Sequence, residues 1–361
     1  MRRSIEVEYW VIDDEGRLTT PGALVDASPG AEREFVAPML EVKTTPCTTT
    51  AELRNELLGR IRDVLLRADD LNKGLVPLAT SLARNTIREL PSERTRIQNR
   101  AFGASFQHTR HCAGTHFHFE QKPGHAIDQL NTLIALDPAL ALVNSARHFR
   151  GEAIAPGARS ELYRHRAYDG CSWQGRLWSY VTDRIDWTRR LQDCYTQFLS
   201  RAQANGADRS TVESCFDPEG AAWIPIKLRP TFGTVEWRSP DTALPSQILR
   251  LAGTMASLLD RIPTTPVRPA EENGRVTDRE ILIPPFETVS THVDLAIEEG
   301  YASDRVRAYL RRMGFDVDAY SPIVADIDAG PLSPREARRL RLEYADRLRA
   351  DVLTRAPATT D

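Results

Sequence analysis

Residues 4–13 read Ser-Ile-Glu-Val-Glu-Tyr-Trp-Val-Ile-Asp. Apolar residues alternate with other residues at a period of two, which predicts a strand with one buried face. These apolar residues are Ile5, Val7, Tyr9 and Val11. The opposite face begins with Glu6 and Glu8, which lie only about 7 Å apart at roughly 3.4 Å of rise per residue. Two carboxylates side by side in so apolar a strand call for a compensating partner.

Three later strand-like stretches also turn ionisable groups to one face. The residues on that face are Glu41 within residues 39–42, His116 and His118 within 114–120, and Glu236 and Arg238 within 233–241. Clustered carboxylates raise one another's pKa unless cations compensate them. Hard divalent cations with oxygen ligands are the natural compensation. One imidazole among mainly carboxylate ligands permits Mg²⁺ or Mn²⁺, whereas a set rich in His or Cys favours zinc.

The order of the expected elements indicates the fold class. We expect strands at residues 4–13, 35–44, 75–79, 116–119, 223–227 and 234–238. We expect helices from a capping box at 49–52 to about residue 74, and at 128–150 with a break at 137–138, 175–204, 246–261 and 334–353. Strands in pairs and runs, with helices between them and gathered at the end, predict an α+β fold. Its sheet would be largely antiparallel, with one open ligand-binding face and helices packed on the other side.

Composition narrows the class of protein. The chain has 361 residues, of which 41% are hydrophobic and 27% charged, as in soluble globular proteins. No stretch approaches the roughly 20 apolar residues that a membrane span needs, and the basic start lacks a signal-peptide core, so we expect a cytoplasmic protein. A net charge of −3 and the lack of a basic, aromatic cluster argue against nucleic-acid binding. Five cysteines without CxxC spacing indicate reduced thiols.

Other interpretations of the same residues stay open at this point. A Glu-x-Glu pair on a strand is most often a solvated face, and Glu236 with Arg238 would make a surface ion pair worth about 1 kcal/mol or less. The His-x-His pair also suits a zinc hydrolase or a cupin-like metal barrel. A hydrolase needs further ligands late in the chain, where His292 is the only histidine after His165. The joint occurrence of these strands favours a metal site.

Taken in order, the motifs resemble those of a known enzyme family. They are residues 5–9, residues 40–46, the Gly-x-His-x-His stretch 114–118 and the Glu-x-Arg-x-x-Asp stretch within 235–241, with weaker similarity at 144–145 and 160–164. The chain resembles the second group of the glutamate–cysteine ligase family, which includes carboxylate–amine ligases. The resemblance covers about residues 4–262. Ser4 and Val7 depart from the family's usual Gly-x-Glu-Glu-Glu, and the part after Pro263 resembles nothing known to us.

The resemblance implies a glutamine-synthetase-like fold whose antiparallel sheet holds ATP, two or three Mg²⁺ ions and the acid substrate. ATP would phosphorylate the γ-carboxylate of glutamate. The amine of cysteine would then attack the acyl phosphate, giving γ-glutamylcysteine, ADP and phosphate. A ligase with the same mechanism but another amine is the first alternative, and a non-catalytic relative that binds nucleotide or glutamate is a further one.

Site residues follow from the motifs and the resemblance together. The candidate metal ligands are Glu6, Glu8, Glu41, His116 and Glu236. Glu41 and Arg238 are the candidate catalytic residues, with Arg238 holding the transferring phosphoryl group through a charge-assisted fork. Arg238 and His118 are expected at the nucleotide, although His118 would also suit a place behind a metal ligand. Arg150 and Arg164 are candidates for the substrate carboxylate.

The chain is expected to divide into three parts. Residues 1–262 would form the catalytic domain, 263–281 a linker rich in proline, and 282–361 a helical region packed on the catalytic domain. The charged surface of this last region is interpreted as a solvated face, with a contact in a homo-oligomer as the alternative. The expected partners are small molecules, namely glutamate and cysteine or another amine, and neither nucleic acid nor membrane.

Overall fold

The computed structural model describes residues 1–354, and its central feature is a seven-stranded sheet. In spatial order the strands are β2 (Ala31–Arg33), β3 (Met39–Lys43), β1 (Arg3–Asp13), β5 (Thr115–Glu120), β9 (Thr234–Trp237) and β8 (Ile226–Arg229). A further strand, β4 (Lys73–Val76), pairs with the end of β1. All of these pairings are antiparallel. The structure therefore confirms an α+β fold with an antiparallel main sheet.

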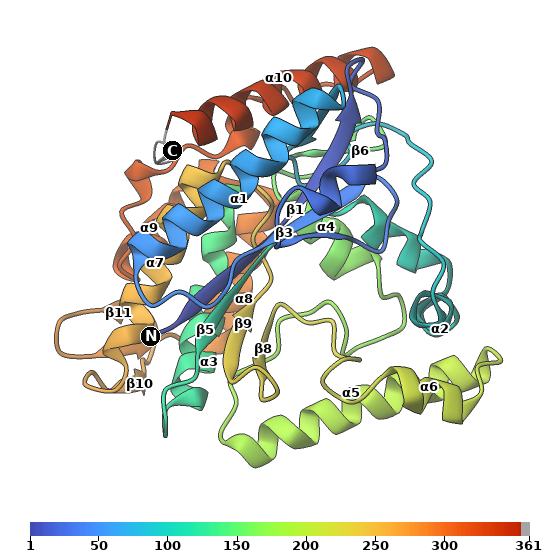
Figure 1. The fold of residues 1–361 in the computed structure, drawn as a ribbon. Helices are drawn as coiled ribbons and strands as arrows, with labels where there is room; N and C mark the ends of the chain where they lie inside the picture. The colour runs from blue at the N-terminus through green and yellow to red at the C-terminus, as the bar shows by residue number, and fades with distance from the viewer. Residues whose placement is uncertain (355–361) are drawn as a thin grey trace.

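Helices cover one face of this sheet. Helices α1 (Thr50–Asp70), α3 (Ala126–Leu136) and α7 (Pro245–Arg261) contact its strands, and α1 and α7 lie to the upper left of the strands in Figure 1. The strand side chains on this face are excluded from water: Ile5, Val7 and Tyr9 of β1 have no exposed surface. Burying such side chains supplies the main driving force for folding. The alternation predicted for residues 4–13 is confirmed over residues 4–9. Beyond them Trp10 and Ile12, on the opposite face, are buried in a second apolar cluster.

Helix α1 begins where its sequence signal predicts. The hydroxyl of Thr49 accepts a hydrogen bond from the backbone N–H of Glu52, whose carboxylate accepts the N–H of Thr49 in return. This reciprocal capping satisfies two backbone donors that the first turn leaves free. The apolar positions at helical spacing are buried, namely Leu53, Leu57, Ile61, Val64 and Leu65.

A second group of elements lies beyond the other face of the sheet, to the right of and below the strands in Figure 1. It comprises α2 (Glu93–Phe102), the 3₁₀ helix η2 (Gly103–His111), α4 (Ala158–Glu161), the π-helical turn η4 (Leu162–Arg166), α5 (Arg184–Ala204) and α6 (Arg209–Cys215). Apart from α4, these elements share an apolar cluster of their own, which includes Phe102, Phe106 and Phe198. This cluster forms one wall over the open face of the sheet.

Three expected helices have different bounds in the structure. Helix α1 ends at Asp70, before the expected end at about residue 74. The helix expected over 175–204 begins only at Arg184, because the side chain of Asp183 caps it by accepting the N–H groups of Ile185 and Asp186. The helix expected over 128–150 ends as α3 at Leu136 and continues as the 3₁₀ helix η3 (Asp137–Val143), which carries Pro138 in its first turn. Proline removes a backbone donor, so an α-helix rarely continues through it.

Residues 263–281, expected as a linker, contain strands. β10 (Val267–Pro269) and β11 (Arg275–Val276) pair with β12 (Ile281–Ile283) in a small sheet. The C-terminal helices are α8 (Phe286–Glu298), α9 (Asp304–Arg312) and α10 (Pro334–Leu353), and a short hairpin joins β6 (His148–Phe149) to β7 (Glu152–Ala153). The remaining 3₁₀ turns are η1 (Gly22–Asp26), η5 (Gly300–Ala302), η6 (Val317–Ala319) and η7 (Ile323–Asp326). One apolar core includes side chains from both sides of the expected linker, and the proposed domain bounds stay a prediction.

One stretch within residues 1–354 is long and apolar enough to cross a membrane, which corrects the expectation that none comes close. It is Ala126–Val143, which spans α3 and η3, and 83% of it is buried inside the protein. Its apolar side chains belong to the main core, beside strands β8 and β9. Burial to this degree is what a core helix of a globular domain shows.

Candidate active site

The pairing of β1 with its two neighbours places charged side chains opposite one another. Glu8 pairs with Glu41 of β3. Glu6 lies between Lys43 of β3 and His116 of β5. Like charges directly opposite each other destabilise a sheet. A cation bound on this face would therefore stabilise the pairing of these strands.

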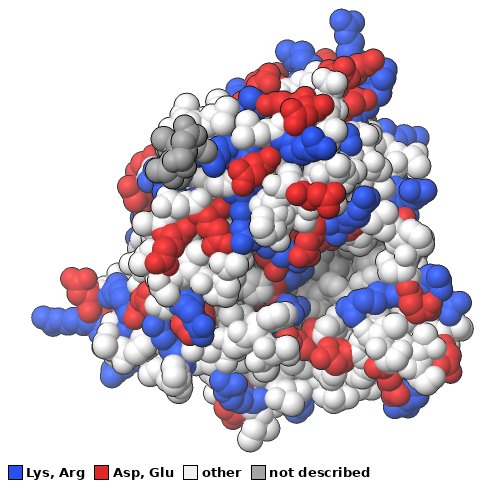
Figure 2. Space-filling model, viewed as in Figure 1, with Lys and Arg blue, Asp and Glu red and all other residues white. Residues whose placement is uncertain are grey.

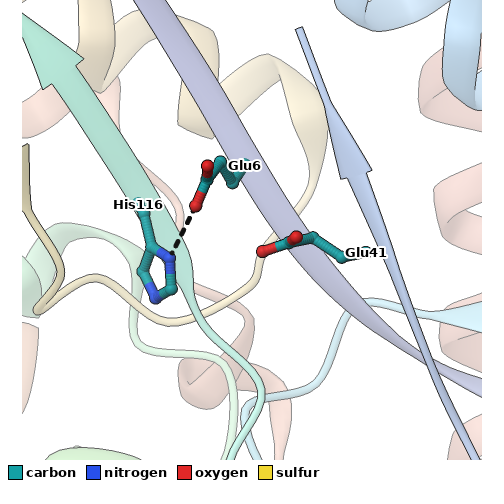
Figure 3. Close-up of side chains that lie close together, drawn as sticks. All are labelled: Glu6, Glu41 and His116. Atoms are coloured by element: carbon teal, nitrogen blue, oxygen red, sulfur yellow. Dashed lines mark hydrogen bonds and ion pairs between the residues drawn. The ribbon is translucent and has the colours of Figure 1, made fainter. Parts of the chain in front are cut away.

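Glu6, Glu41 and His116 form a first group able to hold a metal ion. One ligand atom from each lies within 4.8 Å of the other two. Nδ1 of His116 is 3.1 Å from Oε2 of Glu6. Figure 3 shows the three side chains leaving β1, β3 and β5 on the same side of the sheet and turning toward a common space.

Two further groups meet the same criterion among the described residues: Glu6 with His118 and Glu236, and Glu8 with Glu34 and Glu41. In the first of these, Nε2 of His118 is 3.6 Å from Oε1 of Glu6 and 3.8 Å from Oε1 of Glu236. Glu6 and Glu41 each belong to two groups. The three groups therefore form one continuous row across β9, β5, β1 and β3, which we call the acidic row.

The acidic row brings together all five residues expected as metal ligands and adds two, His118 and Glu34. His118 was expected at the nucleotide or behind a metal ligand. Glu34 precedes β3, and its Oε2 accepts a hydrogen bond from the N–H of Phe35. No alternation marks residues 32–34, so the sequence offered only an acidic residue seven positions before Glu41. The role of Glu34 as a ligand stays a proposal, like that of the other six residues of the row.

The carboxylates of the acidic row cannot all carry a full charge at neutral pH without compensation. Burial raises the pKa of Glu8, Glu34 and Glu41, and a neighbouring carboxylate raises each of the three further. Burial also acts to raise the pKa of Glu6, but hydrogen bonds with His116 and His118 bring it well below the usual range. Bound divalent cations would favour the ionised form throughout the row.

Glu236 is the fully buried end of the acidic row and is held by arginines. Its carboxylate forms ion pairs with Arg238 and with Arg229, whose Nη1 lies 2.7 Å from Oε2. Burial opposes ionisation of this carboxyl, but Arg238 and Lys227 bring its pKa well below the usual range. Arg238 faces the cavity described next, whereas Arg229 also pairs with Glu219 on the other side.

A cavity of about 380 Å³ opens over the acidic row. Its floor includes Glu6, Glu8, Glu41 and His116. Its walls carry five aromatic residues, Phe35, Phe106, Tyr163, Tyr168 and Trp223, and four cations, Lys43, Arg94, Arg159 and Arg238. Figure 2 shows this face of the molecule hollowed to the right of its centre, with basic and acidic groups around the margin.

A second hollow of about 270 Å³ lies at the other end of the row. His118 lines it, together with Ser4 of β1 and Thr234 of β9. Phe232 stands at its edge with 62% of its surface exposed, and its ring lies edge-on to that of His118, with centroids 6.4 Å apart. His118 thus connects the metal-binding groups to a separate binding space.

The structure does not bring Arg150 and Arg164 to either hollow. Nη1 of Arg164 is 2.8 Å from the buried carboxylate of Asp137, and Nη2 donates to the hydroxyl of Ser239. Arg150 is exposed and donates to the side chain of Gln107. Three other arginines line the cavity. Arg238 was expected there, whereas nothing in so arginine-rich a sequence singled out Arg94 or Arg159, of which Arg159 is 5% exposed.

Neither a protein-family model nor a curated protein sequence matches the chain. Solved structures do match it. A bifunctional glutathione synthetase from Pasteurella multocida aligns with 96% of this chain at 14% identity and a TM-score of 0.55. A glutamate–cysteine ligase from Francisella tularensis, solved in complex with AMP, aligns with 98% of it at 13% identity and a TM-score of 0.52. The chain shares its fold with both proteins.

The chain spans about half of the glutathione synthetase, 52%, and 91% of the glutamate–cysteine ligase. The shared fold agrees with the family resemblance of the strand motifs. A structure described as a novel glutamine synthase homologue aligns at 11% identity with a TM-score of 0.35, which is too low to support a common fold. The glutamine-synthetase-like character of the sheet therefore stays a prediction.

Proposed function

We propose that the protein is an ATP- and magnesium-dependent carboxylate–amine ligase that activates the γ-carboxylate of glutamate. The observation that carries the proposal is the acidic row, most of which lines one cavity together with Arg238. The residues of the row that line it are Glu6, Glu8, Glu34, Glu41 and His116. Its donors are mainly carboxylate oxygens, with a single imidazole in each of two groups. Such a set suits Mg²⁺ or Mn²⁺ better than zinc.

The proposed reaction has two steps. A γ-carboxylate oxygen of glutamate attacks the γ-phosphorus of ATP, and ADP leaves. The amine nitrogen then attacks the acyl carbon, phosphate leaves, and the nitrogen loses a proton. Both steps gather negative charge, so catalysis rests on positioning and charge stabilisation, and no side chain has to act as a nucleophile.

Each part of the site has a place in this scheme. The acidic row would hold the magnesium ions, which supply charge neutralisation and alignment of the phosphates when bound. Arg238 would hold the transferring phosphoryl group through its guanidinium fork. The nucleotide base would lie in the second hollow, where Phe232 offers an aromatic face beside His118. Arg159 is better placed than Arg150 or Arg164 to meet the α-carboxylate of glutamate.

The identity of the amine is a separate question. The family resemblance implies cysteine, which would make γ-glutamylcysteine the product, and the alternative is another amine. A zinc hydrolase built on the His-x-His strand gains no support from the late histidine, because Nδ1–H of His292 donates to the carbonyl of Thr288 and the ring stacks on Tyr309.

The test uses hydroxylamine, a small nucleophile that traps activated carboxylates. Purified protein with ATP, Mg²⁺, glutamate and hydroxylamine should form γ-glutamyl hydroxamate and ADP in equal amounts. The Glu6→Gln variant should lose both products. ADP formation that does not depend on glutamate would contradict the proposal, and hydrolysis that needs zinc but no ATP would favour the hydrolase.

Other expectations of the sequence remain predictions. They are a cytoplasmic location, the absence of nucleic-acid and membrane partners, and a solvated surface on the C-terminal helices, with a homo-oligomer contact there as the alternative. Size-exclusion chromatography with light scattering would settle the last of these.

A further inference from the structure

The wall that faces the acidic row is aromatic and firmly packed. Phe106, Tyr168 and Trp223 line the cavity and pack around Phe102, which is buried behind them. The ring centroids of Phe102 and Tyr168 are 4.9 Å apart, and those of Phe102 and Trp223 are 5.3 Å apart, both edge-to-face. Rings in such a cluster are held in fixed positions. The cavity therefore presents a preformed aromatic surface to a bound molecule.

A positive charge stands at the rim of this wall. Arg94 of α2 is exposed, lines the cavity and lies 4.0 Å above the ring of Phe216. One of its N–H groups donates to the carbonyl of Cys215. Within residues 1–354 no carboxylate lies in ion-pair distance of Arg94, although the charge of Asp217 acts on it from further away. A carboxylate that enters the cavity can therefore meet the remaining N–H groups of Arg94.

A second cation of the cavity, Arg159, has no ion pair among residues 1–354 and occupies a different place, where the charges of Glu8 and Asp241 act on it. It lies beside the floor, where it donates to the carbonyls of Arg238 and Ser239. Arg159 is buried, whereas Arg94 stands at the opposite, α2 side of the cavity. The cavity thus offers two separate positions for carboxylates, one at the floor for the acid substrate and one at the aromatic rim.

We propose that the amine substrate is an aromatic or large apolar α-amino acid, with its side chain on Phe106, Tyr168 and Trp223 and its carboxylate on Arg94. This inference rests on the ligase function proposed above and chooses the alternative amine over cysteine. An aromatic side chain buries about 150–250 Å² of surface, far more than a single thiol can cover. The product would be a γ-glutamyl dipeptide, formed with ADP and phosphate by the two steps already given.

The experiment compares amines on the wild-type enzyme with ATP, Mg²⁺ and glutamate held constant. The amines are phenylalanine, leucine, cysteine, alanine and phenethylamine, which keeps the ring but lacks the carboxylate. We expect kcat/KM for phenylalanine to be at least about tenfold higher than kcat/KM for cysteine, and at least about tenfold higher than kcat/KM for phenethylamine. A single apolar or polar contact contributes a factor of this size. A kcat/KM for cysteine equal to or above that for phenylalanine would overturn the inference.

Hydroxylamine tests the ligase function independently of the proposed aromatic amine, because it needs neither the aromatic wall nor Arg94. Hydroxamate formation together with a preference for cysteine would reject the aromatic amine and keep the ligase. If glutamate, ATP and hydroxylamine give no hydroxamate, both proposals fall.

A pair of variants on one helix tests the carboxylate contact. Arg94→Gln should lower kcat/KM for phenylalanine at least about tenfold and erase its advantage over phenethylamine. Arg96→Gln is the matched control, because Arg96 lies two residues further along α2, is exposed, and pairs with Glu93 outside the cavity. Equal losses in the two variants would reject the contact with Arg94. Should Arg94→Gln fail to fold, the comparison of phenylalanine with phenethylamine on the wild-type enzyme still decides it.

Discussion

Glu8 of β1 and Glu41 of β3 pair directly across the sheet, and both carboxylates line the same cavity. Glu41 has one compensating neighbour, Lys43, whose Nζ lies 2.7 Å from Oε2 and is shared with Glu32. Two buried like charges at one register position lower the stability of the empty fold. The two carboxylates are compensated if metal ions bind beside them together with the substrates. The empty protein is then less stable than it would be without these carboxylates, and the measurements below test this.

Replacing Glu41 with Gln will stabilise the metal-free protein and remove most turnover. Burial and the neighbouring Glu34 and Glu6 raise the pKa of Glu41 from 4.5 to about 8. Between these pH values the folded protein keeps a proton that the unfolded chain releases, so the free energy of unfolding falls as the pH rises. The variant lacks this fall. We expect its advantage over wild type to grow by at least about 1 kcal/mol from pH 5 to 8.5 in urea unfolding with EDTA.

Turnover of the Glu41→Gln variant, measured as hydroxamate formation, should drop at least about 100-fold, because the side chain belongs to two of the metal-binding groups. Glu32→Gln is the control: Glu32 pairs with Glu41 across β2 and β3, but its side chain is 57% exposed. Its unfolding should show no such gain with pH. Equal gains in both variants would mean that burial at Glu41 is not the cause.

Magnesium will raise the melting temperature of the wild-type protein in the absence of any substrate. A ligand that binds only the folded state at a hundredfold excess over its Kd contributes about 2.7 kcal/mol. Glu6→Gln should lose most of the thermal shift, because Glu6 belongs to two of the three groups. Glu120→Gln, whose native carboxylate pairs with Arg2 outside the row, should keep it. A larger shift with zinc than with magnesium or manganese would contradict the choice of metal.

The strand residues of the site could be predicted because the alternation of side chains along a strand can be recognised from neighbouring residues alone. Each of Glu6, Glu8, His116, His118 and Glu236 alternates with apolar neighbours on its own strand, so its face is fixed before any pairing is known. Antiparallel order then suffices to bring those faces together. The capped helix α1 could be predicted for the same reason, since its signals lie within four residues.

The residues that sequence reasoning missed lie outside regular strands. Glu34 precedes β3, Arg159 lies on a single helical turn, and Arg94 lies on α2, for which no apolar repeat was recognised. With so many arginines, no local rule distinguishes Arg159 from Arg164, which instead neutralises the buried Asp137. Only the packing of distant segments decides which of them meets the cavity.

Arg238 and Arg229 provide a matched pair for the phosphoryl contact, since both form ion pairs with Glu236. Only Arg238 also lines the large cavity. Arg238→Lys should lower kcat for hydroxamate formation at least about 100-fold, because lysine keeps the charge but loses the planar fork. Arg229→Lys should cost less than tenfold. Similar losses in both variants would assign the effect to the orientation of Glu236 instead.

Gly114 is required because the guanidinium of Arg159 lies close to its backbone. A Cβ at this position would lie 2.2 Å from Nη2 of Arg159, and the backbone N–H of Gly114 donates to Oε2 of Glu8 at 2.6 Å. Gly114→Ala must therefore displace the guanidinium of Arg159. We expect a loss of about 1–3 kcal/mol in the free energy of unfolding and a KM for glutamate at least about tenfold higher.

Gly253→Ala in α7 serves as the comparison, because its added Cβ meets nothing within 4 Å. Alanine inside a helix is favoured over glycine by about 0.8–1.0 kcal/mol, so this variant should gain stability and keep its KM. The two variants add the same methyl group, and only the one at Gly114 touches an arginine of the cavity. If Gly114→Ala loses stability but keeps the KM for glutamate, Arg159 supports the fold and does not bind the acid substrate.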